Sequence, residues 1–163
     1  INAGNVKRLR VAWTHRSGDF VDAPSPKGTA FQATPIHVND TLYYCTPFGR
    51  VFALDPATGR ERWVFDARAA DPATGKPVTT APRMGVRCRG VAYWEDAATG
   101  GAGGKPAACM RRIFTHGDSG RIYALDANTG RLCSSFGAAR GHAGFVSHND
   151  YENHGEGFGG APG

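Results

Sequence analysis

Long apolar runs are absent from this 163-residue sequence. No segment approaches the roughly 18 consecutive apolar residues that a membrane-spanning helix needs, and no segment has the organisation of a signal peptide. The chain begins at Ile1 rather than at an initiator methionine. We therefore expect a piece of a larger protein, whose targeting or anchoring segments would lie upstream.

Lysine is scarce, and the basic residues form no block. The net charge of +5 arises from 15 arginines and 4 lysines against 14 acidic residues, with the arginines spread from Arg8 to Arg140. The densest group is Arg83, Arg87 and Arg89. A diffuse excess of this kind is typical of a solvated surface, so we predict no nucleic-acid partner.

Cysteine is limited to four widely spaced residues, which are Cys45, Cys88, Cys109 and Cys133. No Cys-x-x-Cys pair and no neighbouring pair of histidines accompanies them, which argues against a structural zinc site. The four residues could form two disulfides in an oxidising compartment, or they could be four buried thiols. The sequence leaves both possibilities open.

The sequence contains an internal repeat. Residues 49–65 (GRVFALDPATGRERWVF) and residues 120–136 (GRIYALDANTGRLCSSF) align without gaps at an offset of 71 positions. Repetition of one unit at a fixed spacing is typical of folds that stack similar units. The 23 glycines and 10 prolines indicate many turns and few long helices.

Each copy of the repeat predicts a small antiparallel sheet, because short runs rich in β-branched and aromatic residues alternate with turns. The predicted strands are residues 41–46, 50–55 and 61–65 in the first copy and 112–116, 121–126 and 132–136 in the second, each set preceded by an inner strand within 33–38 or 86–94. Residues 9–16 resemble an isolated outer strand of another unit. Repeated four-stranded units are blades, so we predict an all-β fold, a partial β-propeller of about two blades.

The predicted organisation has four parts. The last part is rich in Gly and His, and its composition favours disorder over a metal site made by His142, His148 and His154. It contains GEGFGG, which matches G-x-G-x-x-G, but no predicted strand precedes it, so we reject a nucleotide site. The parts are residues 1–28, an outer strand of an incomplete blade and a connection; 29–66, the first blade; 67–136, the second blade with long connections; and 137–163, the tail.

The Asp-x-x-Thr-Gly segment of each copy has the chemistry of a turn. In the first copy Asp55 can accept backbone N–H bonds, and Gly59 can adopt the positive φ that returns the chain to a strand. Asp126 and Gly130 hold the same places in the second copy. The segment therefore predicts a tight connection between an inner and an outer strand.

The strand before the turn is apolar on both faces, with Val51 and Ala53 on one and Phe52 and Leu54 on the other. The small Ala53, matched by Ala124, leaves room for a large ring. Trp63 on the outer strand suits an interlocking role there, and Trp13 would correspond to it in the isolated run. The alternative for Trp63 is an ordinary core aromatic.

These residues resemble a known family. Ala53-x-Asp55-x-x-Thr58-Gly59-x-x-x-Trp63 is similar to the tryptophan-docking motif of the eight-bladed quinoprotein dehydrogenases, which use pyrroloquinoline quinone (PQQ). The second copy keeps Ala124, Asp126, Thr129 and Gly130 and has Ser134 in place of the tryptophan. The stretches NVKRLRVAWT, ATPI and CRGVAY, in that order, resemble the membrane-bound glucose and quinate dehydrogenase branch. The resemblance covers about residues 1–136.

The resemblance implies a cofactor site. Arg89 would hydrogen-bond the quinone oxygens of PQQ, where a fixed guanidinium stabilises the negative charge that reduction creates. Gln32 stands where relatives often have a Glu that touches the cofactor, and Cys88, which adjoins Arg89, is predicted to belong to the same cofactor-binding site. A calcium or magnesium ion and a general base would come from later blades, so we assign no catalytic residue and no metal ligand here.

The resemblance also implies a function for the intact protein. It would oxidise a sugar or polyol, glucose-like or quinate-like, and pass electrons to ubiquinone. It would be periplasmic, anchored to the inner membrane through an N-terminal region that this chain lacks, and the chain alone would be inactive. The alternative is a non-catalytic propeller scaffold for protein–protein interaction, which would share the repeated turn but would have no need of Arg89.

Overall fold

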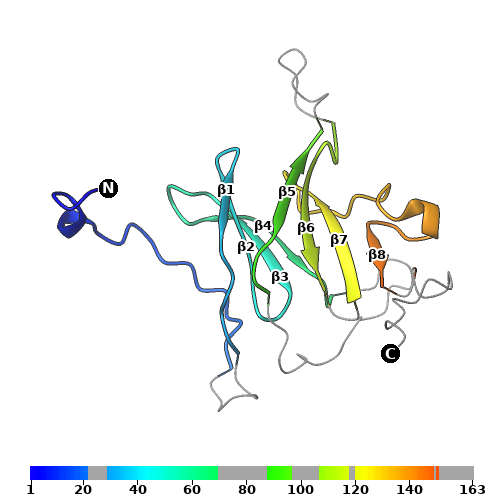
Figure 1. Cartoon of the computed structure of the whole chain (residues 1–163), viewed down its shortest axis with the longest axis horizontal. Coiled ribbons are helices and arrows are strands. Elements are labelled where there is room, and N and C mark those ends of the chain that lie inside the picture. The colour runs from blue at the N-terminus through cyan, green and yellow to red at the C-terminus, as the bar shows by residue number, and fades with distance from the viewer. Residues whose placement is uncertain (22–28, 70–87, 97–106, 118–119, 149, 151–163) are drawn as a thin grey trace, which may run out of the picture.

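The chain folds into two antiparallel sheets that lie side by side (Figure 1). This computed structural model describes residues 1–21, 29–69, 88–96, 107–117, 120–148 and 150. Within those residues there are eight strands, and the helical elements are the short 3-10 turns η1 (Val6–Arg8) and η4 (Ala138–Arg140). Each sheet has four strands in chain order, which confirms the predicted all-β, partial-propeller fold.

The first sheet contains β1 (Ile36–Val38), β2 (Thr41–Cys45), β3 (Arg50–Leu54) and β4 (Glu61–Asp66). Its register aligns Tyr43 with Ala53 and Ala53 with Trp63, so the small residue lies between two large rings. The alternation predicted for the inner strand is confirmed. Ala53 and its neighbours of like orientation face the second sheet, whereas Phe52 and Leu54 pack on the opposite side with Tyr44.

The second sheet contains β5 (Ala92–Glu95), β6 (Arg111–His116), β7 (Arg121–Asp126) and β8 (Phe145–Ser147). The outer strand predicted at residues 132–136 is wrong. Leu132 forms only an isolated bridge with Leu125. Gly137 then adopts a left-handed φ of 81°, which is incompatible with the extended backbone of a strand. The chain leaves the sheet, passes through η4 and returns as β8.

The position of β8 corrects two predicted boundaries. The second sheet extends to residue 147 rather than ending at 136, because residues 137–148 contain η4 and the strand β8, which pairs with β7. The physical reason is a set of local hydrogen bonds: Gly144 N–H donates to the Phe136 carbonyl at 2.9 Å, and Ala124 N–H donates to the Gly144 carbonyl at 3.0 Å. The GEGFGG stretch and His154 lie outside the described residues.

The isolated outer strand predicted at residues 9–16 is also wrong in detail. These residues are extended, but none of the described strands pairs with them, and a strand requires a ladder of backbone hydrogen bonds. Side chains hold the segment on the first sheet instead. His15 bonds to the hydroxyl of Tyr44 at 2.6 Å and to Glu61 at 2.7 Å.

The cysteines form two disulfides, which resolves the alternative that the sequence left open. Cys45–Cys88 joins the end of β2 to the segment before β5, and it therefore links the two sheets. Cys109–Cys133 joins the segment before β6 to the segment after β7. Cα–Cα separations of 5.9 and 5.6 Å suit such bonds.

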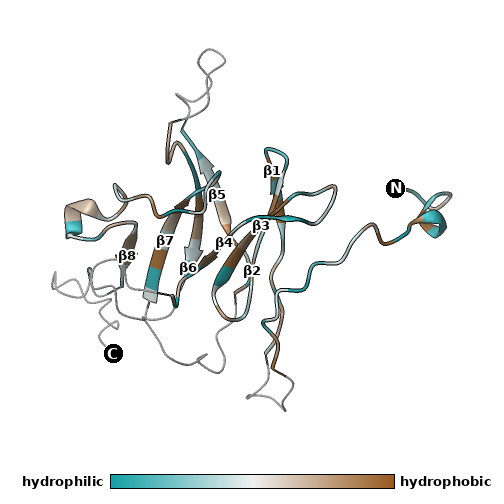
Figure 2. Cartoon of the chain, turned by 180° about the vertical axis from the view of Figure 1, so that it is seen from behind, coloured by the Kyte–Doolittle hydropathy of each residue, from teal (hydrophilic) through white to brown (hydrophobic). Residues whose placement is uncertain are grey.

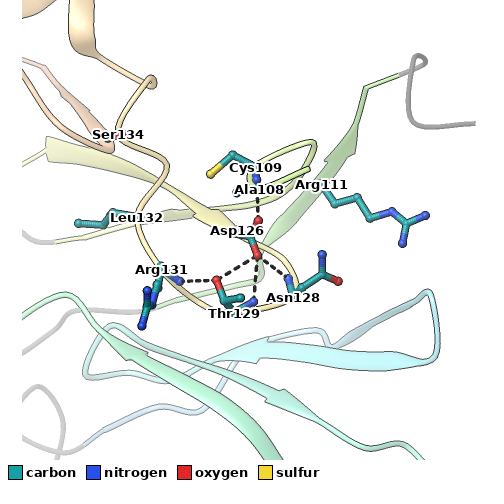
Figure 3. Close-up of a pocket in the computed structure, with 9 residues that line it drawn as sticks. All are labelled: Ala108, Cys109, Arg111, Asp126, Asn128, Thr129, Arg131, Leu132 and Ser134. Carbon is teal, nitrogen blue, oxygen red and sulfur yellow. Dashed lines mark hydrogen bonds between the residues drawn. The ribbon is translucent and has the colours of Figure 1, made fainter. Parts of the chain in front are cut away.

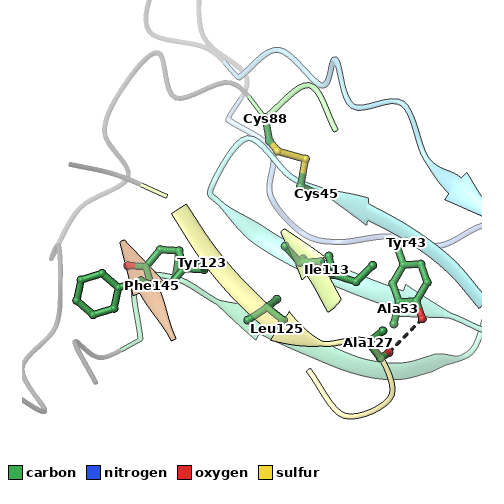
Figure 4. Close-up of a cluster of buried hydrophobic side chains, with 11 residues drawn as sticks. Tyr43, Cys45, Ala53, Cys88, Ile113, Tyr123, Leu125, Ala127 and Phe145 are labelled. Carbon is green, nitrogen blue, oxygen red and sulfur yellow. Dashed lines mark hydrogen bonds between the residues drawn. A yellow bond between two sulfur atoms is a disulfide. The ribbon is translucent and has the colours of Figure 1, made fainter. Parts of the chain in front are cut away.

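The main core lies between the two sheets (Figure 4). Its fully buried members include Val51, Ala53, Ile113 and Leu125, contributed by both sheets. Figure 2 shows hydrophobic colouring along the middle of strands such as β7. Among the described residues, no helix has the length and apolar character needed to cross a membrane.

Candidate functional site

The first Asp-x-x-Thr-Gly turn is organised by one carboxylate. Asp55 Oδ1 accepts the N–H groups of Ala57 and Thr58 at 3.0 and 2.9 Å and the Thr58 hydroxyl at 2.9 Å. Its other oxygen binds Arg62 at 3.1 Å. The hydrogen bonds from Thr58, followed by the one from Arg62, lower the pKa of Asp55 to about 2. Gly59 has a φ of 71°, as the turn requires.

The second turn repeats this geometry with one change (Figure 3). Asp126 Oδ1 accepts Asn128 N–H, Thr129 N–H and the Thr129 hydroxyl, each at 3.0 Å. Its Oδ2 accepts Cys109 N–H at 2.6 Å, where Asp55 binds an arginine. Asp126 is buried, and backbone donors therefore replace the salt bridge.

Each tryptophan of the repeat lies on the glycine of the following turn. The Trp63 ring covers Gly130 so closely that a Cβ there would approach the ring to 2.6 Å, and the indole N–H donates to the Ala127 carbonyl at 3.0 Å. Trp13 covers Gly59 in the same way, with a Cβ distance of 2.5 Å, and donates to the Pro56 carbonyl at 3.0 Å. The interlocking contact is therefore made to the next unit, in addition to the alignment of Trp63 with Ala53.

Ser134 stands at the tryptophan position of the second copy and is exposed. It lines an open hollow of about 790 Å³ beside the second turn (Figure 3). The hollow also contains Arg111, Asp126 and Arg131. The carboxylate oxygens of Asp126 are occupied by the turn, and Arg111 binds Glu95 at 2.8 Å. These groups therefore hold the sheet together rather than present a reactive centre.

The residues predicted to bind the cofactor lie on two segments that meet. Thr34 N–H donates to the Arg89 carbonyl at 2.9 Å, which brings residues 32–34 beside residues 88–90. These segments lead into β1 and β5, so Gln32 and Arg89 lie at the same edge of the two sheets. The local sequence pattern does not reveal that Gln32 and Arg89 lie close together, because they are far apart in the sequence.

The side chains at this edge differ in whether they are free to bind a ligand. Arg89 and Gln32 are exposed, and neither makes a side-chain hydrogen bond or ion pair with any other described residue. Cys88 is 1% exposed and its sulfur is bonded to Cys45, so it offers no thiol to a ligand. In the described part of the chain, this edge thus presents the guanidinium of Arg89 without a counter-charge and the amide of Gln32.

A family model for the β-propeller domain of PQQ-dependent glucose, ethanol and alcohol dehydrogenases matches residues 1–155. The chain belongs to this family. Its sequence is 40% identical over 136 residues to the quinoprotein glucose dehydrogenase of Escherichia coli K12, covering 83% of this chain and 16% of that protein. Quinoprotein glucose dehydrogenase A of Acinetobacter calcoaceticus is 35% identical over 144 residues, covering 84% of this chain and 17% of that protein.

A further relative differs in the substrate that its name gives. Quinate/shikimate dehydrogenase (quinone) of Acinetobacter baylyi is 33% identical over 148 residues, covering 84% of this chain and 17% of that protein. The chain therefore spans about one sixth of the length of the curated relatives that it matches. The family supports PQQ as the cofactor type and a dehydrogenase as the enzyme type.

The resemblance implies metal ligands from later blades, and the composition of the tail offers His142, His148 and His154 as a disfavoured alternative. No group of three or more His, Cys, Asp or Glu side chains in the part of the chain that the structure describes is placed to hold an ion. His142 instead binds Asp150 at 2.8 Å and stacks on Phe145. Arg83 and Arg87 lie outside the described residues.

A buried polar network escaped the sequence reasoning. Asp19 is 4% exposed, and its carboxylate accepts the Thr46 hydroxyl at 2.5 Å and the Arg50 Nε–H at 2.9 Å. Arg50 also donates to the Ser17 carbonyl. The network fixes residues 17–19 on the turn between β2 and β3. No signal could have revealed it, because an Asp between Gly18 and Phe20 reads as an ordinary loop residue.

Proposed function

We propose that this chain supplies part of the PQQ-binding wall of a dehydrogenase that oxidises a sugar or polyol. The observation that carries the proposal is the exposed guanidinium of Arg89, which has no hydrogen-bond or ion-pair partner among the described residues. The backbone of Arg89 is hydrogen-bonded to Thr34, two residues from Gln32, where β1 and β5 begin. PQQ carries carboxylate groups and two adjacent quinone oxygens, all of which accept hydrogen bonds. A donor set of one guanidinium and one amide therefore fits it.

The residues of this chain would bind and orient the cofactor. When bound, PQQ supplies the acceptor for the hydride that leaves the substrate's alcohol carbon. The guanidinium of Arg89 would stabilise negative charge on the quinone oxygens through charge-assisted hydrogen bonds. Gln32 adds a neutral donor and acceptor, which orients a polar group without changing the net charge.

The relatives named above suggest the rest of the reaction. Their names point to glucose and quinate as substrates and to a quinone as electron acceptor. We propose a substrate of this polyhydroxylated class, with ubiquinone as acceptor and a calcium or magnesium ion held by residues outside those described. The two disulfides favour an oxidising compartment, in agreement with a periplasmic location at the inner membrane.

The proposal is tested by titrating PQQ into the intact apoprotein and its arginine variants in the presence of calcium. Arg89→Ala removes a charge-assisted hydrogen bond and should weaken the Kd by about tenfold or more. Arg89→Lys keeps the charge but loses the planar fork, so its Kd should fall between the two.

Arg131→Ala is the matched control. Arg131 is also exposed. β5 pairs antiparallel with β6, and β6 pairs antiparallel with β7, so the start of β5 and the end of β7 lie at opposite ends of the second sheet. Arg131 follows β7 and therefore lies far from Arg89, which precedes β5. Its removal should change the Kd by less than about twofold. Equal effects of the two alanine variants would overturn the role of Arg89 in binding PQQ, and a failure of the intact protein to bind PQQ at all would favour the non-catalytic scaffold. The inactivity of the isolated chain stays a prediction, for which the test is dye reduction by that chain with glucose, PQQ and calcium.

A further inference from the structure

The Cys45–Cys88 disulfide lies directly beside the arginine of the candidate site. Cys88 is the residue before Arg89, and its partner is the last residue of β2. Both cysteines are buried, at 0% and 1% exposure, in the core between the sheets (Figure 4). The bond therefore joins the backbone next to Arg89 to the buried core between the sheets.

Few other restraints act on this backbone. Residues 88–91 belong to no strand, and the ladder of β5 begins at Ala92. Among the described residues, the only backbone hydrogen bond to Arg89 is the one from Thr34 N–H, at 2.9 Å. Val91 adds a packing contact with the core. The disulfide is thus the covalent cross-link next to a side chain that has no hydrogen-bond or ion-pair partner among the described residues.

We propose that the Cys45–Cys88 disulfide positions Arg89 for binding the anionic quinone cofactor. By holding Arg89 in place, the disulfide increases the affinity of the protein for that cofactor. The inference rests on the proposed function and assigns a role to a bond that does not touch the ligand. An arginine side chain has several rotatable bonds, and a hydrogen bond to a ligand is stronger when its donor is already in place. The disulfide fixes the backbone one residue away from Arg89. It therefore reduces the conformational entropy that Arg89 loses when the cofactor binds.

The second disulfide provides a matched control. Cys109–Cys133 is also buried at Cys133 and also closes a loop, but it lies beside the turn at the far end of β7. Removing it should lower stability without moving Arg89. The comparison separates a general loss of stability from a specific effect on the cofactor.

The experiment measures the PQQ Kd of the intact apoprotein in calcium by absorption of the bound quinone. The variants are Cys45→Ala/Cys88→Ala and Cys109→Ala/Cys133→Ala, each studied where its unfolding curve shows a folded protein. The first pair should weaken the Kd by about tenfold, the scale of one misplaced charged hydrogen bond, and the second by less than about twofold. Equal effects of the two pairs would overturn the inference.

A double-mutant cycle tests whether the disulfide acts through the arginine. Arg89→Ala should cost about tenfold in the native background but less than about threefold when Cys45 and Cys88 are already alanine, because interacting residues are not additive. An equal cost in both backgrounds would contradict the positioning role. No cost in the native background would contradict the proposed function itself.

Thr34→Pro keeps the inference testable even if the cysteine variants do not fold. It removes the hydrogen bond from Thr34 to Arg89 and leaves the disulfide in place. If the disulfide positions Arg89, this variant should weaken the PQQ Kd clearly less than Arg89→Ala does, because only the placement of Gln32 is disturbed. A loss as large as that of Arg89→Ala would show that the hydrogen bond, and not the disulfide, holds the arginine.

Discussion

The indole N–H of Trp63 donates to the carbonyl of Ala127, 64 positions further along the chain. The hydroxyl of Tyr43 donates to the same carbonyl at 3.1 Å. One backbone oxygen at the second turn thus receives two hydrogen bonds from the first sheet, while the Trp63 ring covers Gly130. This contact ties the two repeated units together, and it makes the turn glycines sensitive to substitution.

Gly130→Ala should destabilise the protein strongly. The new Cβ would meet the Trp63 ring at 2.6 Å, and the φ of 71° is unfavourable for alanine. We expect a loss of about 3 kcal/mol in the free energy of unfolding, from urea denaturation. Gly141→Ala is the control, because its φ is 76° but nothing lies within 4 Å of the new Cβ. It should cost only about 1 kcal/mol, and equal losses would refute the role of the ring contact.

Trp63→Phe should cost less than Gly130→Ala but remain measurable. Phenylalanine keeps an aromatic ring and loses the N–H that donates to Ala127. The expected loss is about 1–2 kcal/mol, because a buried carbonyl gives up one of its two donors and some packing is lost. Trp13→Phe removes the corresponding bond to Pro56 and should behave alike. A neutral result for both variants would show that the rings act through packing alone.

Asp55 should make stability depend on acid pH. Its pKa in the folded protein is about 2, below the unfolded value near 3.9, so its contribution is present above about pH 4 and is lost as the pH falls toward 2. Asp55→Asn keeps an acceptor for the turn but cannot titrate. The urea midpoint of the native protein should therefore fall more steeply between about pH 4 and pH 2 than that of the variant. Parallel curves would assign the acid sensitivity to other carboxylates.

Asp19→Ala should release the N-terminal segment from the first sheet. The substitution removes the buried carboxylate that binds Thr46 and Arg50, and it leaves the partly buried guanidinium without its partner. We expect a loss of about 3 kcal/mol and faster tryptic cleavage after Arg16. Asp40→Asn is the control, since that carboxylate is 82% exposed and lies 3.4 Å from Arg62, and asparagine tolerates the φ of 56° at this position. Its effect should stay below about 1 kcal/mol, and cleavage rates that match between the two variants would argue against the anchor.

The sequence was sufficient to predict those features that depend on local pattern. The two faces of β3 follow from the alternation of Val51 to Leu54, and the turn follows from Asp55 and Gly59. The outer strand of the second sheet could not be found in this way. Its position depends on the pairing of Cys109 with Cys133 and on a loop closed by Gly144, which are contacts between residues distant in sequence.

The candidate site was predictable only through the resemblance to a family. Nothing in the local pattern around Arg89 or Gln32 distinguishes them from other exposed polar residues. Their juxtaposition arises from the Thr34–Arg89 hydrogen bond and the Cys45–Cys88 disulfide, both of which join different blades. The involvement of Cys88 through a disulfide rather than a free thiol became apparent only in three dimensions.

The most direct test of the account is the structure of the intact protein with PQQ bound. We predict that the guanidinium of Arg89 lies about 3 Å from an oxygen of PQQ, with the Gln32 amide on the same side of the cofactor. PQQ bound away from the edge where β1 and β5 begin, with Arg89 exposed to solvent, would contradict the account.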